Sequence, residues 1–140
     1  MTSLKGHEKI KGEATALPFF SNERNLLECL PGIKRIEGKK FVIEARIGPL
    51  RAELSGEVKE YVVNGNKISN LLQVDGPGLT VLIRTNLSVM GDSLDWDVDY
   101  SMEGSLAKAL ATTVGKQAEE VSRQIIQCTP VVFHQLSSSR

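Results

Sequence analysis

The feature that most constrains the fold is a two-residue alternation of apolar and polar side chains that recurs along residues 33–102. It is clearest at residues 50–58, and it is typical of a strand with one face in a core and the other in water. The wet face predicts an antiparallel sheet. The apolar or small set of this stretch is Leu50, Ala52, Leu54, Gly56 and Val58.

Turn residues predict how the strands pair, because the apolar sets of both strands in a hairpin must fall on one face. Turns are expected at residues 48–49, 64–66, 75–78 and 91–92. The first turn, a two-residue Gly-Pro loop, pairs Ala45 with Ala52. The last, a Gly-Asp loop, pairs Thr85 with Val98.

The two middle turns are placed by the same parity argument. A three-residue loop at residues 64–66 pairs Val62 with Ile68 and keeps both apolar sets on one face. The connection at residues 75–78 pairs Val74 with Leu79. The four turns join five strands, and with the strand that begins at Ile33 the sequence predicts six consecutive antiparallel strands.

The N-terminal third carries a further strand and a short helix. Residues 3–13 alternate like the later strands and predict a first strand, with His7 facing water. Residues 21–30 begin with capping residues and stop before Pro31, which predicts a short helix. Pro18 limits the piece before it to at most one further turn at residues 17–20.

After Met102 the apolar period changes from two residues to three and four. This change predicts one long amphipathic helix over residues 105–128. Gly115 weakens that helix modestly, and Pro130 ends or kinks it.

Length and composition fit one ordinary domain. The chain has 140 residues, of which 41% are hydrophobic and 24% charged, enough to bury a core. We expect one domain over residues 1–136 and a disordered tail at residues 137–140. Lys plus Arg and Asp plus Glu each total 17, so the net charge is zero. This balance argues against a nucleic-acid partner, although a local basic patch at residues 34–40 stays open.

Two further features concern the location and the cysteines. No apolar run approaches the roughly 20 residues that span a bilayer, and residues 1–5 lack a signal-peptide core, so we expect a cytoplasmic protein. Cys29 and Cys128 lie far apart, without a CxxC motif or a nearby His pair. Buried free thiols are the simplest interpretation, a disulfide is left open, and a metal site is not expected.

The residues that could perform catalysis are few. His7 faces outward and His134 lies in the tail, so the sequence shows no Ser-His-acid or Cys-His arrangement. An acid-base enzyme that uses Glu8 or Glu60 with Tyr100 is the alternative to a binding protein. A structural pairing of Glu60 with Asn70 is an equal interpretation. The polar residues expected on the inner face are Glu8, Glu60, Asn70, Thr85 and Tyr100.

Small inward residues raise the question of a cavity. Sheet and helix face each other with small side chains, which either leave a void or let the helix pack closely. An empty, unrelaxed void of roughly 300 Å³ would cost on the order of 7 kcal/mol, comparable to the whole stability of a domain, roughly 5–15 kcal/mol. The small residues are Ala45, Ala52 and Gly56 on the strands and Ala107, Ala111 and Ala118 on the helix.

Three short motifs carry a resemblance. Residues 29–32 (CLPG) close the short helix, residues 47–49 (IGP) lead into a strand that ends at residues 55–58 (SGEV), and residues 104–107 (GSLA) open the last helix. In this order they resemble the CoxG-like family of carbon monoxide dehydrogenase subunits. That family lies within the START-related, polyketide cyclase-like helix-grip superfamily, and the resemblance covers residues 26–126.

The resemblance implies a fold and a function. The fold would be α+β, a helix-grip with a curved seven-stranded antiparallel sheet wrapped around a long C-terminal helix and a short helical excursion after the first strand. The cavity would bind a hydrophobic small molecule, lipid-like or quinone-like, without catalysis and without a cofactor. Relatives are often encoded beside molybdenum hydroxylases, which implies an oxidoreductase complex as partner.

The resemblance also favours a pocket as the interpretation of the small residues. The expected lining residues are Ala52, Leu54, Leu72, Ile83, Thr85, Trp96, Val98, Tyr100, Leu110 and Val114. Two departures from the family are visible: the first helix is abbreviated at residues 16–20 and lacks a tryptophan, and only about ten residues follow Pro130. We therefore expect a different pocket entrance, and the short tail argues against membrane attachment through a C-terminal extension.

The apolar tail at residues 131–136 supports a third hypothesis. Exposed after a helix, it would bind a partner protein, a membrane surface or a second copy of the chain; packed back, it would complete the domain. Homodimerisation and peripheral contact at the inner membrane face are left open.

Overall fold

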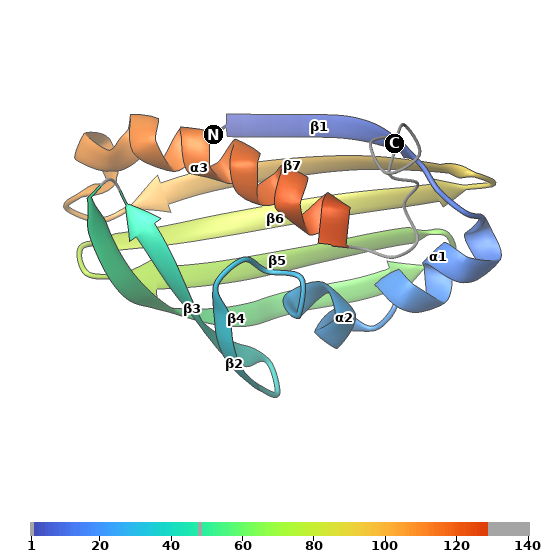
Figure 1. Ribbon diagram of the computed structural model, residues 1–140, viewed down its shortest axis with the longest axis horizontal. Coiled ribbons are helices and arrows are strands. Elements are labelled where there is room, and N and C mark those ends of the chain that lie inside the picture. Colours follow the sequence, from blue (N-terminus) through green and yellow to red (C-terminus); the bar gives the residue numbers. More distant parts are fainter. Residues whose placement is uncertain (1, 48, 129–140) are drawn as a thin grey trace, which may run out of the picture.

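The computed structural model describes residues 2–47 and 49–128. These residues form an α+β structure, a seven-stranded antiparallel sheet with a long C-terminal helix (Figure 1). The sheet is not closed, because β1 and β2 are its two edges in the order β1-β7-β6-β5-β4-β3-β2. The strands are β1 (Thr2–Lys9), β2 (Ile33–Glu37), β3 (Lys40–Ile47), β4 (Leu50–Asn64), β5 (Lys67–Gly76), β6 (Leu79–Met90) and β7 (Ser93–Glu103); the helices are α1 (Glu13–Phe20), α2 (Glu23–Leu27) and α3 (Ala107–Cys128).

Two of the hairpin registers predicted from the apolar pattern are confirmed. Ala45 pairs with Ala52 across β3 and β4, and Thr85 pairs with Val98 across β6 and β7. In both hairpins the strands pair so that their apolar residues lie on the same face of the sheet. The turn residue Gly48 lies outside the described residues.

The register predicted for the β4–β5 hairpin is wrong at its tip. The loop holds two residues, with Gly65 at a φ of 64°, so Asn64 pairs with Lys67 and Val63, not Val62, pairs with Ile68. The extra residue is Lys59, which forms a β-bulge in β4. At this bulge the side chains of β4 change from one face of the sheet to the other. The extra residue that brings the apolar sets of both strands onto one face therefore lies inside β4 and not in the loop.

The pairing predicted for β5 and β6 is wrong by two residues. Gly76 pairs with Leu79, and Val74 pairs with Val81 and not with Leu79. β5 runs two residues further than predicted, to Gly76, so the turn shortens to residues 77–78, while β6 begins at Leu79 as expected. A shift of two residues keeps every side chain on its face, so the apolar pattern does not detect it.

The N-terminal helices differ in length from the prediction. α1 is longer: it spans eight residues and contains Pro18 in its interior, not near its start. The proline removes one backbone donor, which a helix that ends two residues later tolerates. α2 is shorter than the predicted residues 21–30, but it begins with a cap as expected, since the Asn22 side chain accepts a hydrogen bond from the Arg24 backbone N–H at 3.0 Å.

Two packed clusters make up the core. The first lies under α1 and joins the ends of β5, β6 and β7, with Phe20, Ile68 and Leu94 among its buried members. The second lies under α2 against β3, β4 and β5 and includes Leu27 and Phe41. Of the side chains described in α3, none is fully buried. α3 therefore covers the sheet with partly buried side chains, among them Ile126, which packs against the first cluster.

Cys29 and Cys128 form a disulfide, with their Cα atoms 5.6 Å apart. The interpretation as free thiols is therefore wrong. Cys29 follows α2 and Cys128 is the last residue of α3, so the bond connects two elements that are 99 residues apart in the chain. It holds the end of α3 near α2.

Candidate functional site

A large apolar cavity lies between the sheet and α3, with a volume of about 670 Å³. Its walls come from β3, β4, β5, β6 and β7 on one side and from α2 and α3 on the other. The volume falls within the range of about 300–1,000 Å³ that small-molecule sites occupy. The cavity exists because the apolar residues of α3 stay only partly buried above the sheet.

Most residues predicted to line a pocket border this cavity. They come from five elements: Leu54, Leu72, Ile83, Thr85, Trp96, Val98, Tyr100 and Val114. Ala52 and Leu110 are not among the lining residues, whereas Ala45 and Ala118, also singled out as small and inward, are. Ala111 is exposed, so the expectation that it faces the sheet is wrong.

The contribution of α2 and of the residues around it was not predicted from the sequence. Leu26, Leu27 and Leu30 line the cavity, together with Phe20 at the end of α1. The sequence predicted a short helix at residues 21–30 from its capping residues and Pro31, but nothing in it indicated that this helix borders the cavity.

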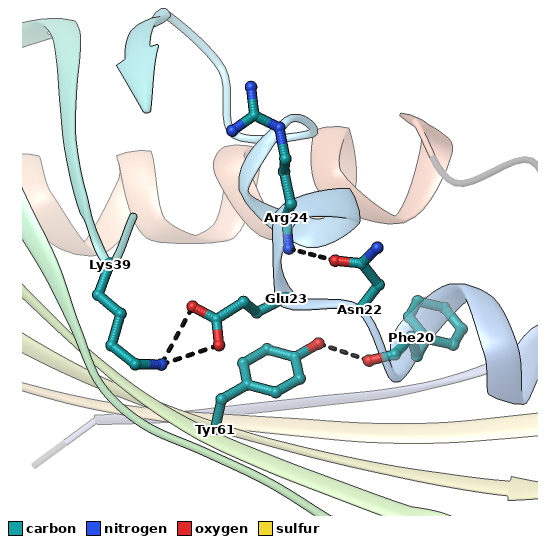
Figure 2. A network of polar contacts seen from close by, with 6 residues as sticks. All are labelled: Phe20, Asn22, Glu23, Arg24, Lys39 and Tyr61. Carbon is teal, nitrogen blue, oxygen red and sulfur yellow. Dashed lines mark hydrogen bonds and ion pairs between the residues drawn. The ribbon is translucent and has the colours of Figure 1, made fainter. Parts of the chain in front are cut away.

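A polar network fastens the α1–α2 segment to the sheet beside the cavity (Figure 2). The Tyr61 hydroxyl donates to the Phe20 carbonyl oxygen at 2.5 Å. The Lys39 ammonium reaches both carboxylate oxygens of Glu23, at 2.9 and 3.3 Å. Burial, together with the nearby Glu23 carboxylate, raises the pKa of Tyr61, so the hydroxyl stays protonated and keeps its donor role at neutral pH.

Tyr100 lines the cavity under α3. A Cβ atom at Gly115 would lie 3.1 Å from the Tyr100 hydroxyl oxygen. Gly115 therefore gives room to this hydroxyl, which accounts for a glycine in the interior of a long helix despite its cost of roughly 1 kcal/mol relative to alanine.

Asn70 is the buried polar residue of the core, with 1% of its surface exposed. It lies on β5 between Tyr61 on β4 and Thr85 on β6, and it lines the cavity. Neither its amide nitrogen nor its amide oxygen has a hydrogen-bond partner among the described residues. Buried polar groups in proteins are as a rule paired, so this amide stands out.

Three of the four charged residues that border the cavity lie at its edge. Glu44 on β3 and Lys116 and Glu120 on α3 line it and are exposed. Their exposure places the opening between α3 and the β3 side of the sheet, near the disulfide. The fourth, Glu23 on α2, is partly buried and paired with Lys39. The other lining residues are apolar or neutral.

The carboxylates that the enzyme alternative needs are not in the cavity. The bulge at Lys59 turns Glu60 to the outer face, where it is exposed and accepts from Arg84 at 3.4 Å. Glu60 pairs with Leu71 and not with Asn70, so the predicted Glu60–Asn70 pairing is wrong. Glu8 accepts a hydrogen bond from the Trp96 indole at 3.3 Å and is not among the lining residues.

The outer face of the sheet carries a row of compensated aspartates. Asp95 contacts His7 at 2.5 Å, Asp97 accepts from Asn86 at 2.9 Å, and Asp99 accepts from Ser3. Within residues 2–47 and 49–128, no group of three or more His, Cys, Asp or Glu side chains is placed to hold a metal ion. In the same part of the chain, no helix combines the length and apolar character needed to cross a bilayer.

The apolar tail, residues 131–136, and the predicted disordered end lie outside the described residues.

Comparison with known proteins identifies one family. The family model for CoxG, a subunit of carbon monoxide dehydrogenase, matches residues 6–131. No curated protein sequence matches the chain.

Solved structures with similar architecture support the fold. A conserved protein from Geobacillus kaustophilus has a TM-score of 0.63 at 14% identity, over 90% of both chains. A hypothetical protein from Helicobacter pylori has a TM-score of 0.64 at 14% identity, over 90% of this chain and 83% of its own. A protein from Rhizobium loti has a TM-score of 0.54 at 13% identity, over 91% and 93%. At these identities the likeness concerns the fold alone.

Proposed function

Because this chain belongs to the CoxG family of carbon monoxide dehydrogenase subunits, we propose that it is a non-catalytic accessory protein of an oxidoreductase of the carbon monoxide dehydrogenase or molybdenum hydroxylase type. In this role it binds a hydrophobic small molecule, lipid-like or quinone-like, in the cavity of a helix-grip fold. The observation that carries the proposal is the apolar cavity of about 670 Å³ between the sheet and α3.

Energetics support an occupant. A closed, dry cavity of this size would cost on the order of 16 kcal/mol if nothing relaxed around it, more than the roughly 5–15 kcal/mol that stabilises a whole domain. Water entering through the rim lowers this cost, but apolar walls bind water poorly. An apolar molecule lowers it further, because the molecule restores the contacts that the walls lack.

The chemistry of the walls supports binding over catalysis. Glu60 lies on the outer face, and Glu8 accepts from the Trp96 indole and does not line the cavity. Of the groups considered for a cyclase-like reaction, Tyr100 alone borders the cavity, without either carboxylate. The lining carboxylate Glu23 is paired with Lys39. The remaining polar groups inside, such as the Thr85 hydroxyl and the Asn70 amide, are neutral and do not act as acids or bases near pH 7. They can orient a ligand.

A carrier of apolar molecules must exchange them with a lipid phase, because such molecules dissolve poorly in water. We therefore place the protein on the cytoplasmic side, with transient contact at the inner membrane face. The opening between α3 and β3, with exposed Lys116 at its rim, is the side that would meet the membrane.

The first test of the proposal is extraction. Purified protein is extracted with organic solvent and the extract analysed by mass spectrometry, alongside native mass spectra of the intact protein. We expect a co-purifying apolar molecule, or uptake of one from vesicles. Repeated failure to detect or load any apolar compound would refute the carrier function.

A matched pair of variants on α3 tests the location. Ala118→Phe places a ring in the cavity, whereas Ala111→Phe places the same ring on the exposed side of the same helix. We expect the first to weaken ligand binding by at least about tenfold, because the ligand loses volume, and the second to leave it unchanged. Trp96, the single tryptophan of the chain and a lining residue, reports binding by its fluorescence. Equal effects of both variants would place the ligand elsewhere.

A further inference from the structure

The unpaired amide of Asn70 indicates which kind of molecule the cavity accepts. The side chain lines the cavity, is 1% exposed, and has neither a donor nor an acceptor partner among the described residues. An asparagine amide offers two N–H donors and one carbonyl acceptor. Leaving all of them unpaired in an apolar surrounding is unfavourable.

The neighbours of Asn70 do not satisfy it. Tyr61, opposite it on β4, donates its hydroxyl to the Phe20 carbonyl oxygen. Thr85, opposite it on β6, borders the same cavity but is not a partner of the amide. The amide is thus a polar point in the apolar wall between α3 and the middle of the sheet, where a cavity ligand would lie.

The charged residues around the cavity further limit which ligand group can pair with the Asn70 amide. Four charged residues line the cavity: Glu44, Lys116 and Glu120 are exposed at the rim, and Glu23 is already paired with Lys39. None of them is therefore a free counter-ion for a group beside Asn70. An ionised head group placed beside Asn70 would lose its hydration without a paired charge. A neutral head group in the same place would need no paired charge.

We propose that Asn70 is the specificity-determining contact of the cavity, and that the ligand is a neutral lipophilic molecule with a group that both donates and accepts hydrogen bonds, a hydroxyl or a primary amide. This inference rests on the proposed ligand-binding function and narrows its ligand class: among quinone-like molecules it selects the reduced hydroquinone form, which carries hydroxyls, over the oxidised quinone, which offers only acceptors. A molecule that only accepts, such as an ester or a ketone, pairs the Asn70 N–H and leaves its carbonyl unpaired. A hydrocarbon pairs neither.

The test is a series of compounds with one chain length: lauryl alcohol, lauramide, methyl laurate and dodecane, titrated against Trp96 fluorescence. Each is measured on the wild-type protein and on Asn70→Leu. We expect Asn70→Leu to bind the alcohol and the amide about tenfold more weakly than the wild type does, when each affinity is expressed relative to that for dodecane. The affinity for dodecane itself should be unchanged or higher in the variant. Comparing the variants removes the differences in water solubility among the compounds.

Two control variants assign the effect. Ser69→Ala lies next to Asn70 on β5 but faces outward, where its hydroxyl donates to Asn86 at 2.9 Å; it should leave the whole series unchanged. Thr85→Val removes a neighbouring hydroxyl of the wall and should change the preference less than Asn70→Leu. If leucine does not fit the site, Asn70→Val removes the same polar atoms with a smaller side chain.

The outcomes separate this inference from the proposed function. Binding of all compounds with the same relative affinities in wild type and Asn70→Leu would overturn the inference, with an internal water as the partner of the amide, and would leave the carrier function standing. A larger loss in Thr85→Val than in Asn70→Leu would also overturn it. Binding of none of the compounds by the wild type would refute both.

Discussion

At the scale of single residues, small side chains decide how closely the strands pack around the cavity. Gly56 on β4 lies opposite Phe41 on β3, as the apolar pattern predicted. A Cβ atom at Gly56 would lie 2.2 Å from the Phe41 ring, and that ring is buried in the cluster under α2. The glycine is therefore required by the approach of a side chain and not by its backbone conformation.

We predict that Gly56→Ala lowers the free energy of unfolding by about 1–3 kcal/mol, because the Phe41 ring must leave its position to admit the methyl group. Urea unfolding followed by circular dichroism measures the change. Ser55→Ala, one residue earlier on the exposed face, is the control and should be near neutral. A neutral Gly56→Ala would mean that Phe41 is not held over this residue in solution.

The same scale shows what the sequence could and could not predict about the site. Eight of the ten predicted lining residues border the cavity, because inward positions on strands follow from parity. Asn70 was expected inward, but its partner was expected to be Glu60. The bulge at Lys59, which has no signal such as a glycine or a proline, turned Glu60 outward and placed Tyr61 beside Asn70.

At the scale of elements, the apolar alternation predicted which face of the sheet a side chain takes better than it predicted which residues pair across two strands. The β3–β4 and β6–β7 registers were predicted correctly because tight turns fixed them. The β5–β6 register was wrong by two, since Gly76 and Leu79 continue the strands without changing any face. The position of α2 against the cavity could not be predicted, because it depends on tertiary contacts such as that between Tyr61 and Phe20.

The disulfide between Cys29 and Cys128 belongs to this scale, because it joins the chain after α2 to the end of α3. Near this end Ile126 packs, partly buried, against the cluster under α1, and the disulfide adds a covalent tie. We predict that Cys29→Ser with Cys128→Ser lowers the free energy of unfolding by about 3–5 kcal/mol, since a loop of about 100 residues is no longer closed in the unfolded chain. Urea unfolding at equilibrium measures it.

The control for this prediction is a reductant. Adding one to the wild-type protein should lower its unfolding midpoint to that of the double serine variant and should leave the variant unchanged. An unfolding midpoint of the wild type that does not respond to the reductant, after thiol titration has shown complete reduction, would mean that the bond does not constrain the fold.

At the scale of the whole molecule, the core and the cavity share one layer of side chains. The buried residues of the cluster under α2, among them Leu27 and Phe41, also line the cavity, and α3 covers its other side. The helices around the cavity are attached in different ways. The α1–α2 segment is fastened to the sheet by packing and by the Tyr61 and Lys39 contacts (Figure 2), whereas α3 lies above β6 and β7 (Figure 1) and is tied at its end by the disulfide.

An incompletely packed α3 should depend on the ligand for part of its stability. We predict that removing the bound molecule by organic extraction or detergent exchange lowers the free energy of unfolding by about 3 kcal/mol, the linkage term for a ligand held at about 100 times its dissociation constant. For a domain of this size that corresponds to a fall in melting temperature on the order of 10 °C. Calorimetry of loaded and stripped protein measures it.

The α3 variants show whether this stabilisation comes from the cavity. Ala118→Phe, which fills part of the cavity, should bring the melting temperatures of loaded and stripped protein together, because its ring supplies contacts that the ligand otherwise makes. Ala111→Phe, on the exposed side of α3, should keep the full difference. If stripped and loaded wild type melt at the same temperature, the region under α3 is stable without an occupant and the cavity is not a site that a ligand completes.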